Sequence, residues 1–159
     1  MHCEANRHFR VASAIIEKAG RYLITQRRCV GPLAGLWEFP EGKVNPGETD
    51  DVALKRVVLE RVGVDVTIGR WRAHRVHHYT VYSVDLVSYE ASILSGQEPR
   101  ALRVADFRWV TSQELELYPF PSADQATADL LLGIGQGHLE GTGAREASSR
   151  EVSLPGEHG

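Results

Sequence analysis

The chain has 159 residues and a formal net charge of −3, and 42% of its residues are hydrophobic and 25% charged. This length predicts one domain with a core of its own, and the composition excludes collagen-like, coiled-coil and wholly disordered proteins. No apolar run approaches the ~18–20 residues that cross a bilayer and residues 1–10 hold no apolar block, so we expect no membrane span and no signal peptide. Two cysteines are too few for a disulfide framework and fit a reduced cytoplasm, and the negative net charge argues against DNA as a partner.

The predicted elements alternate between strands and helices. In chain order they are two strands, Val11–Glu17 and Tyr22–Arg27, forming a hairpin around Gly20, a short apolar run at Leu36–Phe39, a helix between Thr49 and Gly63, strands at Val64–Ile68, Tyr79–Tyr89 and Phe107–Val110, a helical turn at Thr111–Leu115 and a helix at Ser122–Leu132. Thr49 is a typical N-cap and Gly63 a typical C-terminal stop, whereas Ser122 and Gln125 have the spacing of a capping box. This order predicts an α/β protein with helices on both sides of a mixed sheet.

The composition of the chain changes once, near Gly133. Seven of the fifteen glycines lie in residues 133–159, in a segment without apolar periodicity. Such a segment cannot bury enough apolar area to offset the entropy lost on ordering it. We therefore predict a domain over residues 9–132, a flexible N-terminus over residues 1–8 and a disordered tail over residues 133–159.

One stretch in the middle of the chain has the spacing of a known motif. It runs Gly42-Lys-Val-Asn-Pro-Gly-Glu48, then seven residues, then Arg56-Val-Val-Leu-Glu-Arg-Val-Gly63-Val64. This resembles the Nudix box of nucleoside diphosphate-linked hydrolases, which reads Gly, five residues, Glu, seven residues, Arg-Glu-apolar-x-Glu-Glu-x-Gly-apolar. Residues 34–40, 107–110 and 118–124 are also similar to that family, especially to its (d)NTP pyrophosphohydrolase branch. The resemblance implies the Nudix fold, an α/β/α sandwich with a central mixed β-sheet.

The resemblance also implies a chemistry. Positions 57, 60 and 61 lie on one helical face, and in the family all three are glutamates that bind divalent cations, usually Mg²⁺. The cations bind the diphosphate bridge and help water attack phosphorus, which gives a nucleoside monophosphate and pyrophosphate. Arg56 corresponds to the family arginine that holds the loop glutamate, here Glu48, and positions the helix. The residues implied as catalytic are Glu48, Arg56 and Glu60.

The acids of this motif are depleted in the present chain. Val57 can neither bind a metal nor accept a proton, and Arg61 places a fixed positive charge where the family has an anion. Positions 57, 60 and 61 therefore sum to zero charge instead of −3. Arg103 stands where the family has a further carboxylate, whereas Glu41 replaces a family glycine and adds one. The carboxylates left to bind Mg²⁺ or Mn²⁺, and to bind it weakly, are Glu41, Glu48 and Glu60.

Four residues are expected to contact substrate by the same resemblance: Arg28, Phe39, Arg61 and Asp124. The two arginines would lie near the phosphates, and Asp124 would contact the edge of the nucleobase. Each residue also has a structural interpretation. Arg28 could be a solvent-facing strand end, Asp124 a favourable first-turn residue, Phe39 part of the core, and Arg61 with Glu60 a solvated helix face.

Two other groups in the sequence could suggest a function, but neither has the partners that it would need. His74, His77 and His78 lack a Cys or carboxylate at metal-ligand spacing, so we expect exposed strand histidines. Cys29 has no His or Asp that would make it a nucleophile, and we expect an ordinary thiol.

These observations predict a Nudix-type nucleotide pyrophosphohydrolase that acts on or binds (d)NTP-type nucleotides, with weak turnover. The alternative is a catalytically inactive Nudix domain that binds a nucleotide or an oxidised guanine in nucleic acid, as the C-terminal domain of adenine-specific DNA glycosylases does. The lack of a glycosylase domain and the negative charge argue against a DNA reader. Members of the family are frequently dimers, which makes a homodimer a further possibility.

Overall fold

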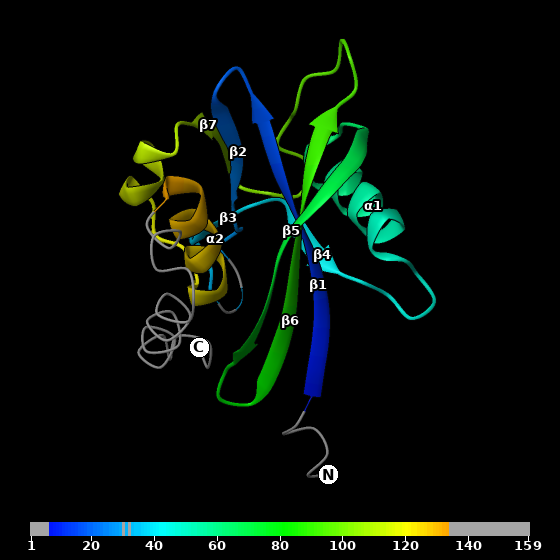
Figure 1. The fold of residues 1–159 in the computed structure, drawn as a ribbon, viewed down its shortest axis with the longest axis vertical. Coiled ribbons are helices and arrows are strands. Elements are labelled where there is room, and N and C mark those ends of the chain that lie inside the picture. The colour runs from blue at the N-terminus through cyan, green and yellow to red at the C-terminus, as the bar shows by residue number, and fades with distance from the viewer. Residues whose placement is uncertain (1–6, 30, 32, 134–159) are drawn as a thin grey trace.

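The fold is a seven-stranded mixed sheet with helices on both sides, as Figure 1 shows. A computed structural model describes residues 7–29, 31 and 33–133, so the predicted tail beyond Gly133 and the first six residues of the predicted N-terminal segment lie outside the described residues. In chain order the elements are β1 (Arg7–Lys18), β2 (Arg21–Gln26), β3 (Trp37–Glu38), β4 (Glu41–Lys43), α1 (Asp50–Val62), β5 (Val66–His78), β6 (Tyr82–Ile93), β7 (Asp106–Val110), the 3₁₀ helix η2 (Gln113–Leu117) and α2 (Ser122–Leu132). The prediction of an α/β fold with a mixed central sheet is confirmed.

Strand β1 lies at the centre of the sheet, and its short pairing with β2 determines where the two parts of the sheet separate. It pairs in parallel with β6 along Arg7–Ile16, whereas the other strand pairs are antiparallel. On its other edge β1 pairs with β2 only at Glu17 and Lys18, and with β4 at Val11–Ser13. Strands β2, β3 and β7 therefore diverge from β1 beyond the hairpin, and in Figure 1 they lie beside α2 while α1 lies on the far side of β1. This divergence leaves room between the two parts of the sheet.

Helix α1 begins and ends where the sequence predicts. The Thr49 hydroxyl accepts a hydrogen bond from the Val52 N–H at its N-terminus. Gly63 ends the helix in the left-handed region at φ 73°, which glycine adopts without steric cost, and its N–H donates to the Leu59 carbonyl. Both predicted caps are confirmed.

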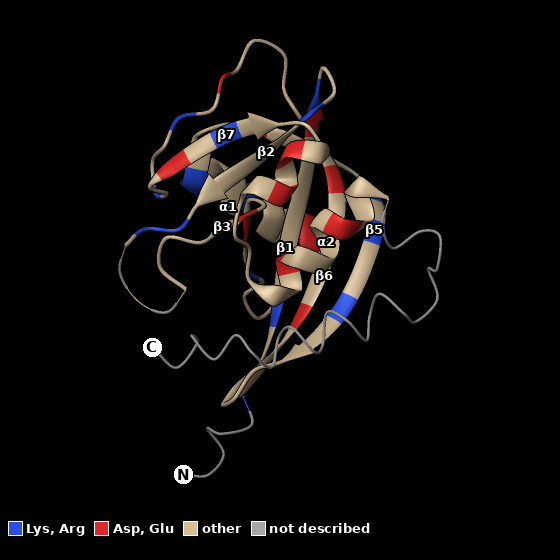
Figure 2. Ribbon diagram, turned by 90° about the vertical axis from the view of Figure 1, so that its left-hand side faces the viewer, with Lys and Arg blue, Asp and Glu red and all other residues tan. Residues whose placement is uncertain are grey.

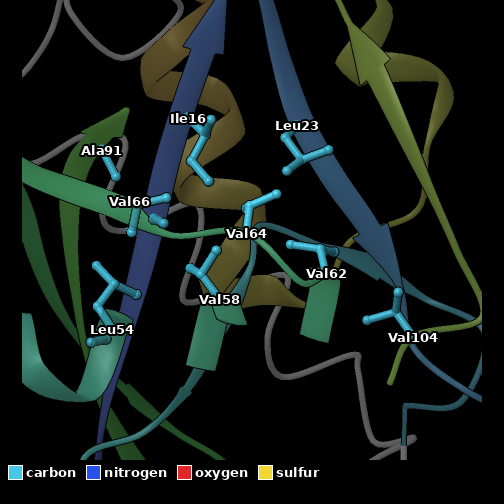
Figure 3. Close-up of a cluster of buried hydrophobic side chains, with 11 residues drawn as sticks. Ile16, Leu23, Leu54, Val58, Val62, Val64, Val66, Ala91 and Val104 are labelled. Atoms are coloured by element: carbon cyan, nitrogen blue, oxygen red, sulfur yellow. The ribbon is translucent and has the colours of Figure 1, made fainter. Parts of the chain in front are cut away.

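The main hydrophobic core joins α1 to the sheet. Figure 3 shows Leu54, Val58 and Val62 of α1 facing Ile16 of β1 and Leu23 of β2. All five side chains are at most 1% exposed. A second cluster lies between β2, β3, η2 and α2 and contains Phe39 and Phe120. The two clusters hold α1 and α2 against the sheet, and the functional residues lie between them.

The sequence predicted the first strand after α1 too short and displaced the second. Strand β5 runs to His78, ten residues beyond the predicted end, and β6 covers residues 82–93 rather than 79–89. The Arg- and His-rich residues 70–78 show no strand alternation because β5 is an edge strand with much of its surface in solvent, and register shifts between Ile68 and Ala73 disturb its pattern further. The prediction of three exposed histidines is wrong for His77, which is 5% exposed, since it lies on the covered face of this longer strand.

The predicted capping box of α2 is also wrong. The N-cap residue is Pro121, no side chain caps the helix, and the Gln125 amide instead donates to Asp129 one turn along the helix. Ser122 is buried at 3% exposure within the helix. Ser122 therefore packs inside the fold and does not cap the helix, and this packing cannot be read from the local spacing.

Among the described residues, no helix is long and apolar enough to span a membrane.

Candidate functional site

A cavity of about 380 Å³ opens where the two parts of the sheet diverge. Its walls come from β1, β4, β6, the β5–β6 turn and the first turn of α2. The lining residues include Phe9, Val11, Arg27, Glu38, Glu41, Gly42, Arg61, Tyr79, Tyr82, Leu86 and Asp124. Aromatic and aliphatic side chains thus surround a small set of charged ones, the usual composition of a small-molecule site.

Three carboxyl groups lie together in this cavity. One carboxyl oxygen from each of Glu38, Glu41 and Asp124 lies within 4.8 Å of the other two. Glu38 and Asp124 are each 2% exposed, and Glu38 forms an ion pair of 3.0 Å with Arg27. Oδ1 of Asp124 and Oε1 of Glu41 accept no hydrogen bond from an N–H or hydroxyl group although both atoms are buried, and the two carboxyls share a hydrogen bond with each other. Buried carboxyl oxygens with so few donors are rare, so this cluster has bonding capacity left for a ligand.

Burial favours the protonated form of each carboxyl in this cluster. It raises the pKa of Glu38 to about 8 and that of Asp124 to about 7, and the pKa of Glu41 is raised as well. The repulsion between neighbouring carboxylates adds to the rise for Glu38 and Glu41, whereas the Arg27 guanidinium opposes it. A mixture of protonated and ionised carboxyls can both donate and accept hydrogen bonds.

Phe39 supports the cavity from behind. Its side chain is fully buried and stacks on Phe120, with ring centroids 5.6 Å apart and planes 7° apart. The Phe39 side chain belongs to the core and is absent from the cavity lining. The Phe39 backbone forms a hydrogen bond with the Asp124 carboxyl. Its predicted role as a substrate contact stays a prediction.

A second pocket, of about 270 Å³, continues from the cavity. Its lining residues are Arg27, Arg28, Glu60, Arg61 and Arg103, and Arg27 and Arg61 line both spaces. Figure 2 shows basic segments in blue at the end of β2 and in the loop that enters β7, on the same side of the molecule. The site therefore has a carboxyl-rich end and an arginine-rich end.

The loop before α1 is held by one arginine. Arg56 donates two hydrogen bonds to Glu48, of 2.8 and 2.9 Å, and a third to the Lys43 carbonyl. The bonds from Arg56 and from the Asn45 N–H hold the pKa of Glu48 down at about 2. The predicted contact between Arg56 and Glu48 is present, and it ties the loop to the helix.

The acids near α1 leave few free oxygens for a hard cation. Both oxygens of Glu48 are engaged by Arg56, and Glu60 lies 3.6 Å from the same guanidinium. Val57 is 2% exposed and packs against Gly42 of β4, and Arg61 lines the arginine pocket beside Glu60. Mg²⁺ needs several oxygens in near-octahedral positions, which this helix does not offer. That Glu41, Glu48 and Glu60 bind a cation weakly stays a prediction.

The structure brings some predicted residues together and separates others. Asp124 and Glu41 line the cavity, Arg28 and Glu60 line the arginine pocket, and Arg61 lines both. Sequence reasoning missed the ion pair between Arg27, the residue after β2, and Glu38 of β3. The one available signal was their polarity: Glu38 interrupts the apolar run at residues 36–39, and Arg27 extends the strand beside Arg28.

Comparisons with known proteins agree with this architecture. A family model described as NUDIX domain matches residues 11–130. The chain is 33% identical to the CTP pyrophosphohydrolase of Escherichia coli K12 over 118 residues, which cover 72% of this chain and 84% of the relative. It is 36% identical over 126 residues to a putative 8-oxo-dGTP diphosphatase 2 of Mycobacterium tuberculosis, with 76% and 85% covered. The crystal structure of a MutT NUDIX hydrolase from Burkholderia pseudomallei superposes with a TM-score of 0.69 at 25% identity, covering 77% of this chain and 97% of that one.

Together with the fold and the Gly42–Val64 motif, the family match shows that this chain belongs to the Nudix family.

Proposed function

We propose that the chain binds a (d)NTP-type nucleotide and hydrolyses it slowly to a nucleoside monophosphate and pyrophosphate. The polarity of the site carries this proposal, because carboxyl groups line one end and arginines line the other. A nucleobase edge offers hydrogen-bond donors and acceptors that suit a partly protonated carboxyl cluster, and phosphates suit guanidinium groups. The relatives named for CTP and 8-oxo-dGTP support a nucleotide as the substrate class.

We assign Asp124 to binding the edge of the nucleobase. It is buried at the start of α2, its Oδ1 accepts no hydrogen bond from an N–H or hydroxyl group, and it faces the same cavity as Glu38 and Glu41. A favourable first-turn aspartate would be expected at the solvent-exposed helix end, where its charge costs little. The burial of this carboxyl therefore favours a ligand-binding role over a purely local one.

We expect slow hydrolysis because the residues around Glu60 on its helix face are not acids. In this family the acids of the helix supply the cation site, and here Val57 is apolar and Arg61 is basic. Glu60 is the acid that remains on that face, with Glu48 and Arg56 holding the loop in place. We expect weak binding of Mg²⁺ or Mn²⁺ and correspondingly slow hydrolysis.

The first test is calorimetric titration of the purified chain with CTP and 8-oxo-dGTP, with pyrophosphate release measured in Mg²⁺ and in Mn²⁺. We expect binding with little turnover, and Asp124→Ala should weaken binding by about 1–3 kcal/mol because a hydrogen bond to a buried carboxyl is lost. Asp51→Ala, on the exposed start of α1, is the matched control and should bind as the wild type does. Equal affinities for Asp124→Ala and the wild type would remove Asp124 from the site. Turnover at ordinary enzyme rates, ~1–10³ per second, would contradict the proposed slow hydrolysis.

A further inference from the structure

The arginine pocket carries positive charge that the described residues do not neutralise. Its lining holds four arginines and one glutamate. Arg27 is paired with Glu38, and Arg28 donates to the Leu102 carbonyl at 3.3 Å. Among the hydrogen bonds and ion pairs of the described residues, none involves the Arg61 or Arg103 side chain, and Glu60 has Arg56 as its partner. The Arg61 guanidinium acts on the Glu38 and Glu41 carboxyls of the adjoining cavity, where it opposes the rise in their pKa. Arg28 and Arg103 therefore face the pocket without a carboxylate partner among the described residues, and Arg61 is only partly balanced.

Backbone hydrogen bonds hold these arginines in place. The N–H groups of Leu102 and Arg103 both donate to the Arg61 carbonyl, at 3.0 and 3.1 Å. The Ala105 N–H donates to the Gln26 carbonyl at 2.9 Å, which ties the same segment to the end of β2. Arg28, Arg61 and Arg103 come from a strand end, a helix end and a loop. The backbones of Arg61 and Arg103 are bonded directly, and the Arg28 side chain donates to the same loop at the Leu102 carbonyl. Like charges kept together by the fold, rather than spread over the surface, form an anion-binding site.

Two of these arginines stand where the family motif has acids. Arg61 takes the place of a helix glutamate, and Arg103 takes the place of the carboxylate before β7. An acidic site binds phosphates through a cation that it holds, whereas a basic site binds phosphates directly. Guanidinium groups suit this role because each offers a planar pair of donors to two phosphate oxygens.

We propose that the arginine pocket binds the phosphate chain of the ligand directly, through Arg28, Arg61 and Arg103, in the absence of a divalent cation. The proposal rests on the proposed function for the nucleotide in the adjoining cavity, since Arg27 and Arg61 line both spaces. Binding then needs no Mg²⁺. It weakens as salt rises, because Arg28 and Arg103 are exposed and their charges are screened.

The test uses the full chain in EDTA, titrated by calorimetry with inorganic tripolyphosphate, CTP and cytidine. We expect the wild type to bind tripolyphosphate and CTP without a cation. Arg61→Ala with Arg103→Ala should weaken both by at least tenfold. Arg103→Ala alone, which changes a residue that lines only the arginine pocket, should leave cytidine binding unchanged. Arg61→Lys with Arg103→Lys should recover part of the loss, since charge returns without the planar donor pair.

Lys55→Ala is the matched control, because it removes one positive charge from an exposed position of the same helix outside both pockets. It should leave all three affinities within about twofold of wild type. If the double alanine variant is poorly folded, Arg103→Ala alone, at an exposed loop position, should still weaken tripolyphosphate binding severalfold.

Two results separate this inference from the proposed function. Binding of CTP only when Mg²⁺ is added, with no effect of the double alanine variant, would overturn the arginine site and leave the nucleotide function standing. Arginine-dependent binding of tripolyphosphate with CTP no tighter than tripolyphosphate would confirm the arginine site and contradict a nucleotide in the cavity. Unchanged tripolyphosphate binding in the alanine variants would overturn the inference on its own.

Discussion

At the level of single residues, the contact between Gly42 and Val57 sets how closely β4 approaches α1. A Cβ atom at Gly42 would lie 2.7 Å from Cγ2 and 3.1 Å from Cγ1 of Val57, which is closer than carbon atoms pack. The absence of a side chain at Gly42 thus lets β4 carry Glu41 into the cavity. This contact also explains why an apolar residue is accommodated at position 57, where the family has an acid.

We therefore predict that Gly42→Ala destabilises the protein by about 1–3 kcal/mol through overpacking, measured by urea unfolding. Adding Val57→Ala should recover part of this loss, because the two substitutions share one contact. Gly69→Ala is the control: a Cβ there would lie 3.4 Å from the Glu90 carbonyl oxygen, an ordinary contact. Equal stability of Gly42→Ala and Gly69→Ala would show that the contact does not limit packing.

At the level of elements, helix α1 has the backbone and caps of a Nudix helix but not its charges. Val57 contacts β4, whose Glu41 and Gly42 line the cavity, and Arg61 lines both the cavity and the arginine pocket. An acid at either position would thus lie beside the proposed phosphate site. Because Arg61 would pair with a new acid at position 57, both positions have to change together.

We predict that Val57→Glu with Arg61→Glu gains Mg²⁺-dependent pyrophosphate release of at least about tenfold, a barrier reduction near 1.4 kcal/mol. The same variant should lose binding of tripolyphosphate in EDTA, since one arginine becomes an acid. Val57→Glu alone should gain little. Val57→Gln with Arg61→Gln is the neutral control for shape, and a similar gain in that variant would show that charge is not the cause.

At the level of the whole molecule, the buried carboxyl cluster links stability to pH. Glu38 and Asp124 have pKa values of about 8 and about 7 in the folded chain, raised by burial from ordinary values of 4.5 and 3.8. The folded state therefore holds protons that the unfolded state has released, so these two groups make stability fall as pH rises from about 4 to about 8, and they have no further effect above that. His77 acts in the opposite direction, because burial lowers its pKa to about 4 from 6.5, but its effect is complete by about pH 6.5.

We predict that the melting temperature of the wild type falls between about pH 6.5 and pH 8 and then levels off, and that Asp124→Asn reduces the slope up to about pH 7. The measurement is calorimetric melting at constant ionic strength. Asp51→Asn is the control, since a hydrogen bond from Thr49 lowers the pKa of Asp51 and its titration ends far below this range. Parallel slopes for Asp124→Asn and the wild type would mean that Asp124 is ionised throughout.

The sequence by itself determined the features whose causes are local. Thr49 and Gly63 bound α1 because capping depends on residues within one turn, and the hairpin turns at Ala19 and Gly20, which both have positive φ. The contact of Arg56 with Glu48 followed from the motif, which places them eight residues apart. The family itself could be recognised from spacing alone.

Only the tertiary structure decided which charged groups meet. Glu38 and Asp124 are 86 positions apart, and Arg61 and Arg103 are 42 apart, so no local pattern links them. The first pair meets because the sheet diverges after the β1–β2 hairpin and α2 closes over the gap, and the second because the loop before β7 returns to the end of α1. Local spacing shows that acids are missing from the helix. The long-range packing decides that arginines gather in their place and that Glu38, Glu41 and Asp124 come together in the adjoining cavity.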